Sequence, residues 1–305
     1  MSKKASYLLG ILATILIGTF LYNKFCCQEC AVEKPEPKTD VMITDYTGMG
    51  DYNIFNLSGK DMTYTCQDNF KFLKNDFKNI QPVNDSINTG IDMLKSYFEK
   101  NKFDKMMITG YARKDEKNTS AFPNLGLARA NDLKSYFVSK GIPANRFETQ
   151  GELRDEWKIE KDTVLGAADF RILMQDEVAK QETVDWNAMK TTINASPLIL
   201  YFNTGQTDID LSVEQRQKVA DLVKYLDNVE GAKLSAVGHT DNAGNRDLNV
   251  KLGLGRADFA KDYLSKNGVS SDKIETSSKG PDEPIADNKT ADGKSKNRRT
   301  VVTIK

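Results

Sequence analysis

Two oppositely charged side chains near the carboxyl end of the chain are candidates for binding a charged ligand. Asp241 follows a short apolar run that ends at Gly238, and Arg256 lies on a predicted helix one turn beyond Leu252. A loop between a strand and the next helix can fold back and bring the two charges within a few ångströms of each other. Such a pair suits a zwitterion with an ammonium and a carboxylate on one carbon, because the planar fork of arginine gives a carboxylate two parallel hydrogen bonds.

Six further residues are candidates for ligand contact. They belong to the loop, to the helix and to the carboxyl terminus, and they are His239, Thr240, Asn249, Leu252, Arg298 and Arg299. We expect Asn249 to add a neutral contact and the two arginines to line the far wall. Because neighbouring residues of a strand face opposite ways, one arginine is alternatively an ordinary strand-edge charge.

The charged pair also has interpretations without a ligand. Asp241 alternatively caps its loop or forms a structural ion pair with Arg256. His239, the only histidine of the chain, stands close to Asp241 in sequence, but no serine or cysteine nucleophile and no set of metal ligands stands beside it. We therefore expect no enzyme, no cofactor and no metal, and a histidine that packs at the strand end.

The elements that must position these residues alternate between strands and helices. Apolar periodicity predicts, in chain order, a strand at 198–202, a helix at 213–225 after Ser212, a strand at 233–238, a loop at 239–249, a helix to Lys266, a strand at 274–277, a proline loop and a strand at 299–304. This order is typical of a two-layer α/β unit with helices over one face of a mixed sheet.

The same region resembles a known family. The residues that carry the resemblance are, in order and spacing, Gly238-His-Thr-Asp241, Gly244, Asn249, Leu252, Arg256-Ala257, Gly280, Pro284-Ile285, Asn288 and Asn297-Arg298-Arg299. The pattern over 197–305 resembles the OmpA-like peptidoglycan-binding domain of OmpA carboxyl termini and MotB-like proteins. The resemblance implies non-covalent binding of the peptidoglycan stem peptide, commonly through diaminopimelate. Gly253 departs from the serine usual in the family, which weakens a detail at the predicted helix start.

An earlier part of the chain repeats this scaffold. Residues 74–110 align with 202–238 without a gap, and after a slip of one residue the segment 125–130 aligns with 252–257, so that Arg129 matches Arg256. A repeat of about a hundred residues predicts two tandem βαβαβ domains with mixed sheets, an α/β (α+β two-layer) fold.

The loop of the first copy differs from that of the second. Arg113 stands in the place of Asp241, and Phe122 stands in the place of Asn249. Because Arg113 would repel the ammonium of the ligand, we expect a degenerate copy that acts as a spacer or a protein-docking module. The alternative is that Asp115 or Glu116 rebuilds the site.

The amino terminus predicts a transmembrane signal anchor at 5–23. Residues 5–22 are uncharged and mostly apolar, close to the ~20 residues that a membrane helix needs, and Lys3 and Lys4 before them favour a cytoplasmic amino terminus. A cleaved signal peptide is the alternative because the run is of borderline length, but no small-residue cleavage site follows it. The run holds no ionisable side chain and is therefore an anchor, not an ion conduit. Small residues at every fourth position could pack two helices into a homodimer: Gly10, Thr14 and Gly18.

The complete domain plan has six parts. These are a cytoplasmic end (1–4), the anchor (5–23), a linker (24–60), the degenerate domain (61–175), a connector (176–196) and the OmpA-like domain (197–305). Disulfides and unpaired thiols are equally open for the four cysteines, Cys26, Cys27, Cys30 and Cys66.

Composition and topology together suggest where the chain acts. The 43 basic residues balance 43 acidic ones, which gives no support for nucleic-acid binding. We expect an inner-membrane protein with periplasmic domains that fixes an envelope complex to the peptidoglycan, with other envelope proteins as partners. If the amino terminus is cleaved, the outer membrane or the periplasm is the alternative location. The alternative function is an interaction subunit of a secretion or motility machine in which wall binding is secondary.

Overall fold

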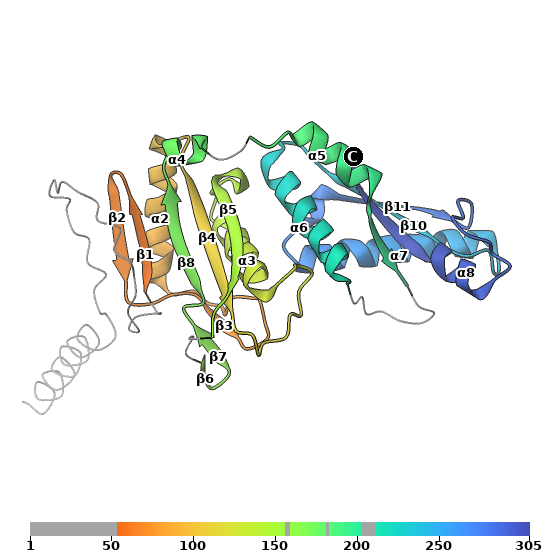
Figure 1. The fold of residues 1–305 in the computed structure, drawn as a ribbon, viewed down its shortest axis with the longest axis horizontal. Coiled ribbons are helices and arrows are strands. Elements are labelled where there is room, and N and C mark those ends of the chain that lie inside the picture. The colour runs from red at the N-terminus through yellow and green to blue at the C-terminus, as the bar shows by residue number, and fades with distance from the viewer. Residues whose placement is uncertain (1–53, 156–158, 181–182, 203–210) are drawn as a thin grey trace, which may run out of the picture.

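The computed structural model describes residues 54–155, 159–180, 183–202 and 211–305 (Figure 1). The predicted anchor with its small-residue face, and Cys26, Cys27 and Cys30, lie outside these residues. Within the described part, no helix combines the length and apolar character that a bilayer crossing requires. The described residues form two α/β units, so the predicted fold class is confirmed.

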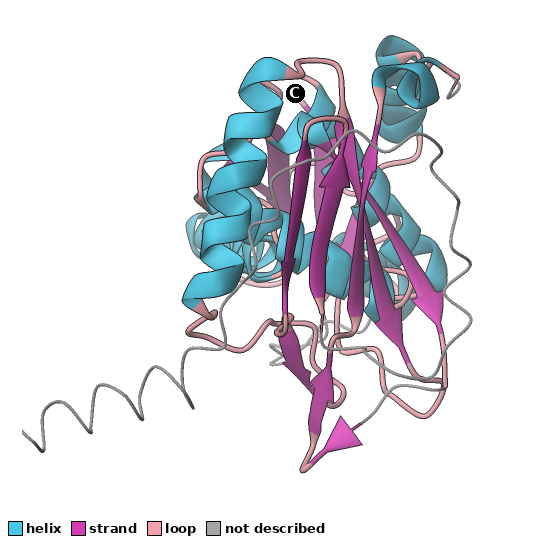
Figure 2. Ribbon diagram, turned by 90° about the vertical axis from the view of Figure 1, so that its left-hand side faces the viewer, coloured by secondary structure: helices cyan, strands magenta, loops and turns pink. Residues whose placement is uncertain are grey.

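The first unit is centred on a sheet with the strand order β5-β4-β8, in which β4 runs parallel to β5 and antiparallel to β8. Its elements are β1 (Phe55–Gly59), β2 (Met62–Cys66), β3 (Lys71–Leu73), α2 (Asp85–Lys100), β4 (Lys105–Ala112), α3 (Leu125–Ser139), η1 (Ala144–Arg146), β5 (Phe147–Leu153), β6 (Ile159–Glu160), β7 (Thr163–Leu165), β8 (Ala168–Leu173) and α4 (Gln175–Ala179). Helix α3 packs on β4 and β5, and Figure 2 shows a long helix against one side of the strands of this unit.

The core of the first unit is aromatic. The ring of Phe55 packs edge-to-face on Phe170 with 4.9 Å between centroids, and Phe70 and Phe137 surround it. Because β1 contributes the fully buried Phe55, the first unit begins before the predicted boundary at residue 61. Cys66 is buried in β2, where its thiol donates to the carbonyl oxygen of Asp68 (3.7 Å).

The second unit has the sheet order β11-β10-β12-β9. Strand β10 runs parallel to β11 and antiparallel to β12, the same arrangement as β4 with β5 and β8. The elements are α5 (Trp186–Ala195), β9 (Leu198–Tyr201), α6 (Val213–Asn228), β10 (Leu234–His239), α7 (Arg246–Lys266), η2 (Ser271–Lys273), β11 (Ile274–Gly280), α8 (Ala291–Asn297) and β12 (Arg299–Ile304). Helix α7 packs on β10 and β11, as α3 packs on β4 and β5.

Three elements differ from the sequence prediction. Helix α5, predicted as part of the connector, belongs to the second unit, because Asn194 exchanges two hydrogen bonds of 2.8 Å with the backbone of Ile304. Helix α7 begins at Arg246, inside the predicted loop, because Asn245 caps it by accepting from the N–H groups of residues 247 and 248. Helix α8 has no apolar periodicity and was not predicted.

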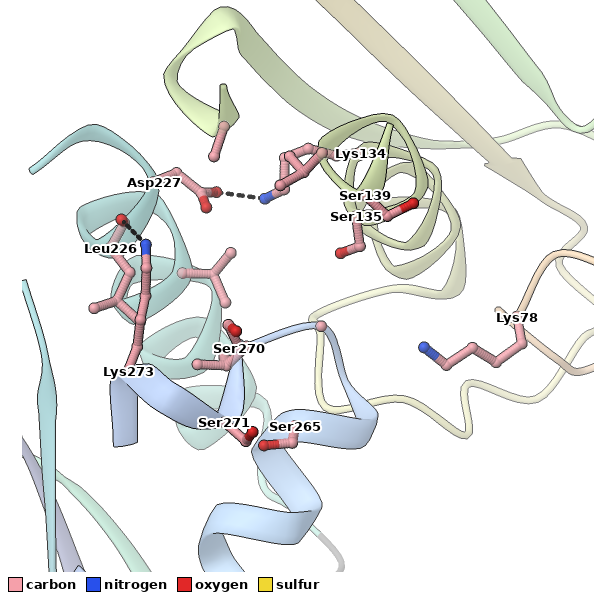
Figure 3. A pocket seen from close by; sticks show the side chains of 15 residues that line it. Lys78, Lys134, Ser135, Ser139, Leu226, Asp227, Ser265, Ser270, Ser271 and Lys273 are labelled. Atoms are coloured by element: carbon pink, nitrogen blue, oxygen red, sulfur yellow. Dashed lines mark hydrogen bonds and ion pairs between the residues drawn. The ribbon is translucent and has the colours of Figure 1, made fainter. Parts of the chain in front are cut away.

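The two units contact each other directly. The amide of Ala121 donates to Asn267 Oδ1 (2.8 Å), and Phe122 is buried in the core of the second unit. Lys134 on α3, with 5% of its side chain exposed, forms an ion pair with Asp227 on α6 beside a cleft of about 630 Å³ (Figure 3). The units are therefore joined by buried polar and apolar contacts.

Candidate functional site

A close helix–strand crossing places the candidate site at the carboxyl end of β10. A Cβ on Gly238 would lie 1.8 Å from the carbonyl oxygen of Gly253, so glycine is required where α7 crosses the strand. Gly253 therefore lies inside a helix, and the predicted effect on a helix start is wrong. One turn further along α7, Arg256 donates from Nη1 to the carbonyl oxygen of His239 (3.0 Å). The crossing thus places this guanidinium over the end of the strand.

Asp241 is partnered by a different arginine from the one considered in the sequence. Its Oδ2 accepts from Arg298 Nη1 at 2.9 Å, and its Oδ1 accepts from the amide of Ala243 at 3.1 Å. Both charged side chains are mostly buried, with 15% of Asp241 and 18% of Arg298 exposed. Burial acts to raise the pKa of Asp241, but the bonds from Arg298 and Ala243 and the charge of Arg298 hold it below its usual value. Asp241 is therefore a carboxylate at neutral pH.

Arg256 lies beside this ion pair. Burial first, and then the charge of Arg298, lower the pKa of Arg256, while the charge of Asp241 acts in the opposite direction. Among the described residues, the guanidinium makes one hydrogen bond, to His239, and lies 5.7 Å from the centroid of the Phe202 ring. Its remaining N–H donors are thus without a described protein acceptor.

Buried polar atoms without a partner gather at the same place. Within the described residues these include His239 Nδ1, Thr240 Oγ1, Arg298 Nε and Thr300 Oγ1. Gly238 pairs with Thr300 in the sheet, so these residues lie where the end of β10 meets the start of β12. Native structures rarely leave such atoms unpaired, and a water or a ligand is the usual explanation. Burial, with the charge of Arg299, lowers the pKa of His239 to about 4, so this side chain is neutral at pH 7.

Asn249 and Arg299 have surroundings that suit support better than contact, whereas Leu252 is exposed. Asn249 is buried, and its Nδ2 donates to the carbonyl oxygen of Ala243 (2.9 Å), which braces the loop. Arg299 is buried and donates to the carbonyl oxygens of Asn297 (3.4 Å) and Glu283 (3.1 Å). Leu252 is half exposed on α7.

A chain of amides supports the loop from below. Asn297, fully buried, accepts from the amides of Ile285 (2.8 Å) and Ala286 (3.1 Å) and donates to Asn288 Oδ1 (2.9 Å). Asn288 Oδ1 in turn accepts from the amide of Asn242 (3.3 Å), next to Asp241. Both asparagines belong to the sequence pattern, but their role could not be read from it because each bonds backbone that is distant or irregular.

The first unit has an equivalent arginine with different partners. A Cβ on Gly110 would lie 2.1 Å from the oxygen of Gly126, and Arg129 Nη1 donates to the carbonyl oxygen of Tyr111 (2.8 Å), as Arg256 does to His239. Here Glu116 pairs with Arg129 at 2.6 Å, with both side chains 0% exposed.

Arg113 does not face this position. Its side chain pairs with Asp115 (2.9 Å) and donates to the carbonyl oxygen of Asp155 (3.0 Å). Arg113 is thus bonded within its own loop and to Asp155, and Glu116 is the residue that reaches Arg129.

The family comparison matches the second unit. Residues 201–298 match the OmpA family. The peptidoglycan-binding protein ArfA of Mycobacterium tuberculosis is 36% identical over 106 residues, which cover 35% of this chain and 32% of ArfA. The probable lipoprotein YiaD of Escherichia coli is 42% identical over 71 residues, 23% of this chain and 32% of YiaD. The chain thus spans about a third of the length of these relatives.

Solved structures match over a similar share of the chain. The peptidoglycan-associated lipoprotein from Burkholderia pseudomallei has a TM-score of 0.32 and 23% identity, and the match covers 35% of this chain and 89% of that one. The family match includes the strand end, the loop and the helix that carry Asp241 and Arg256. Residues 201–298 of this chain therefore form an OmpA family domain.

Proposed function

We propose that the second unit binds peptidoglycan non-covalently, through the diaminopimelate residue of the stem peptide. The carrying observation is the cluster of Asp241, Arg256 and Arg298 at the end of β10, where buried polar atoms lack a described partner. The OmpA family match and the likeness to ArfA, which is named a peptidoglycan-binding protein, support this choice of ligand.

The three charges fit a ligand with more than one ionised group. The two guanidiniums and one carboxylate sum to one positive charge, so a carboxylate can enter at Arg256 without leaving a buried negative charge unpaired. The ammonium on the same carbon then meets Asp241, since a carboxylate has about four acceptor positions and two are used by Arg298 and Ala243. The ligand thus completes the charge pairing that the protein begins.

The remaining predicted residues divide into contact and support. In this proposal Thr240 Oγ1 and Arg298 Nε, which lack a described partner, contact a further ligand oxygen, and Leu252 offers an apolar rim. Asn249 and Arg299 hold the backbone of the two loops, and neutral His239 packs at the strand end. The role is binding and not catalysis.

We propose that the whole chain is a wall anchor. In this view residues 5–23 hold it in the inner membrane, with Gly10, Thr14 and Gly18 available for dimerisation, and the second unit grips the wall. The shared strand order and the paired Gly–Gly crossings support a domain duplication. The loop of the first unit docks on the second unit, which favours a spacer over a subunit that recruits envelope partners through that loop.

Sedimentation with purified sacculi tests the proposal. The full chain should co-sediment with sacculi that contain diaminopimelate, and much less with sacculi that contain lysine in its place, because lysine lacks the second carboxylate. Asp241→Ala should reduce binding by about thirtyfold, whereas Asp247→Ala, which removes an exposed carboxylate on α7, should not. Equal binding of wild type and Asp241→Ala with folding intact would exclude the assigned site.

A further inference from the structure

The carboxylate of Glu116 is bound on all sides in the first unit. Its Oε1 accepts from Arg129 Nη2 (2.6 Å) and from the amide of Asn75 (3.1 Å). Its Oε2 accepts from Arg129 Nη1 (3.1 Å) and from the amide of Arg113 (2.9 Å). Burial alone would raise the pKa of Glu116, but the bonds and charge of Arg129 and the two backbone donors hold it below its usual value. These four donors form a complete carboxylate-binding site.

Arg129 has no donor left for another ligand. Besides Glu116 and Tyr111, it donates from Nε to the carbonyl oxygen of Asp76 (3.0 Å) and from Nη2 to that of Leu73 (3.3 Å). All five N–H groups of the guanidinium are thereby used. Arg256, which makes the matching bond to the strand end, has one hydrogen bond among the described residues. In the first unit the arginine therefore finds its acceptors within the chain, whereas most donors of Arg256 have no described acceptor.

The loop that carries Glu116 continues directly into the contact between the units. Lys117 donates its amide to Asn75 Oδ1 (2.8 Å), which holds the loop just after Glu116. Arg216 on α6 then donates to the carbonyl oxygen of Ser120, and the amide of Ala121 donates to Asn267 Oδ1 (2.8 Å). The loop is thus held by hydrogen bonds at Glu116 and Lys117 on one side and at Ser120 and Ala121 on the other.

We propose that the first unit retains a carboxylate-binding site, that Glu116 of the same chain occupies it, and that this occupancy holds residues 113–122 in the shape that joins the two units. The proposal uses the site around Arg256 only as a structural comparison. Wall binding by the second unit and occupancy of the first unit can therefore fail independently.

Chemical rescue of Glu116→Ala tests the proposal in the full chain, purified in detergent. Once the carboxylate of Glu116 is removed, the loop should open, and amide hydrogen exchange in residues 113–122 should accelerate by about tenfold or more. Potassium acetate should reverse most of this change, whereas potassium chloride at equal ionic strength should not, because acetate fits the emptied site. The matched control is Asp115→Ala, which removes an exposed carboxylate of the same loop and should give neither effect.

Glu116→Gln keeps the test decisive if the alanine variant does not fold. The amide has the same shape but lacks the charge, so exchange should accelerate, and acetate should not restore it because the side chain still fills the site. Wild-type exchange rates in Glu116→Gln, or equal effects of acetate and chloride on a folded Glu116→Ala, would overturn the proposal. Sacculus binding by the same preparations reports separately on the second unit.

Discussion

Replacing Arg256 by alanine is the most direct test of how the second unit holds its proposed ligand. The guanidinium is half-buried and makes one described hydrogen bond, to His239, so most of its donors are available to a ligand carboxylate. Removing one partner of such a desolvated charge contact costs about 2–5 kcal/mol, or roughly thirtyfold to several-thousandfold in Kd. The lost bond to the strand end should lower the free energy of unfolding by only about 1 kcal/mol.

The assay is isothermal titration calorimetry of the full chain with a soluble muropeptide that contains diaminopimelate. Arg256→Lys should fall between wild type and Arg256→Ala, because lysine keeps the charge but not the bidentate fork. The control is Arg246→Ala on the same helix, whose side chain is 63% exposed and pairs with Asp282 at 2.5 Å, and an exposed pair of this kind contributes at most about 1 kcal/mol. Binding by folded Arg256→Ala within about threefold of wild type would refute the reasoning.

Four further predictions concern stability, autonomy and topology. The pKa of His239 is about 4 in the folded state and about 6.5 in the unfolded state, so the unfolded state binds a proton first as the pH falls. The free energy of unfolding should therefore fall by up to about 1.4 kcal/mol per pH unit between these two values. His239→Gln should flatten this slope in urea titrations. The free energy of unfolding of a fragment of residues 185–305 should be about 2–4 kcal/mol higher than that of residues 196–305, because Asn194 of α5 bonds Ile304 and Trp186 packs on Tyr225. Equal midpoints and slopes of the two urea titrations would contradict this role of α5. A fragment of residues 54–180 should fold but not sediment with sacculi, since every donor of Arg129 is used, and sedimentation like that of the full chain would show a second working site. A reporter active only outside the cytoplasm should be active after Lys305, and mass spectrometry should find Lys3 and Lys4 in the mature chain; a start near Cys26 would contradict the anchor.

The periodicity of apolar residues predicted the helices and strands that pack on a core. It did not predict helix starts that depend on a polar capping side chain. The strand at 299–304 and the helix from 213 coincide with their predictions because apolar residues recur at regular spacing there. The start of α7 was missed because Asn245 caps it within a polar, glycine-containing stretch that resembles a loop. Helix α8 is short and polar, and it begins with the capping side chain of Thr290.

The sequence named Asp241 and Arg298 as candidates but did not predict that they pair with each other. Asp241 and Arg298 are 57 positions apart, and their contact depends on the antiparallel register of β10 and β12, which no local pattern reveals. The orientation of Glu116 was equally hidden. A loop sequence contains the acidic residue, but only the folded backbone shows that it points inward to Arg129 while Arg113 points outward.

The two units share a backbone arrangement but differ in what their equivalent arginines bind. In both, a glycine of the central strand lets a helix approach closely, and an arginine on that helix holds the carbonyl oxygen at the strand end. In the first unit Glu116 completes that arginine's bonding within the chain. In the second unit Asp241 pairs with Arg298, and most N–H donors of Arg256 have no described acceptor. Equivalent substitutions should therefore differ in kind: loss of Arg129 removes a fully buried ion pair and should unfold the first unit, whereas loss of Arg256 should chiefly remove binding.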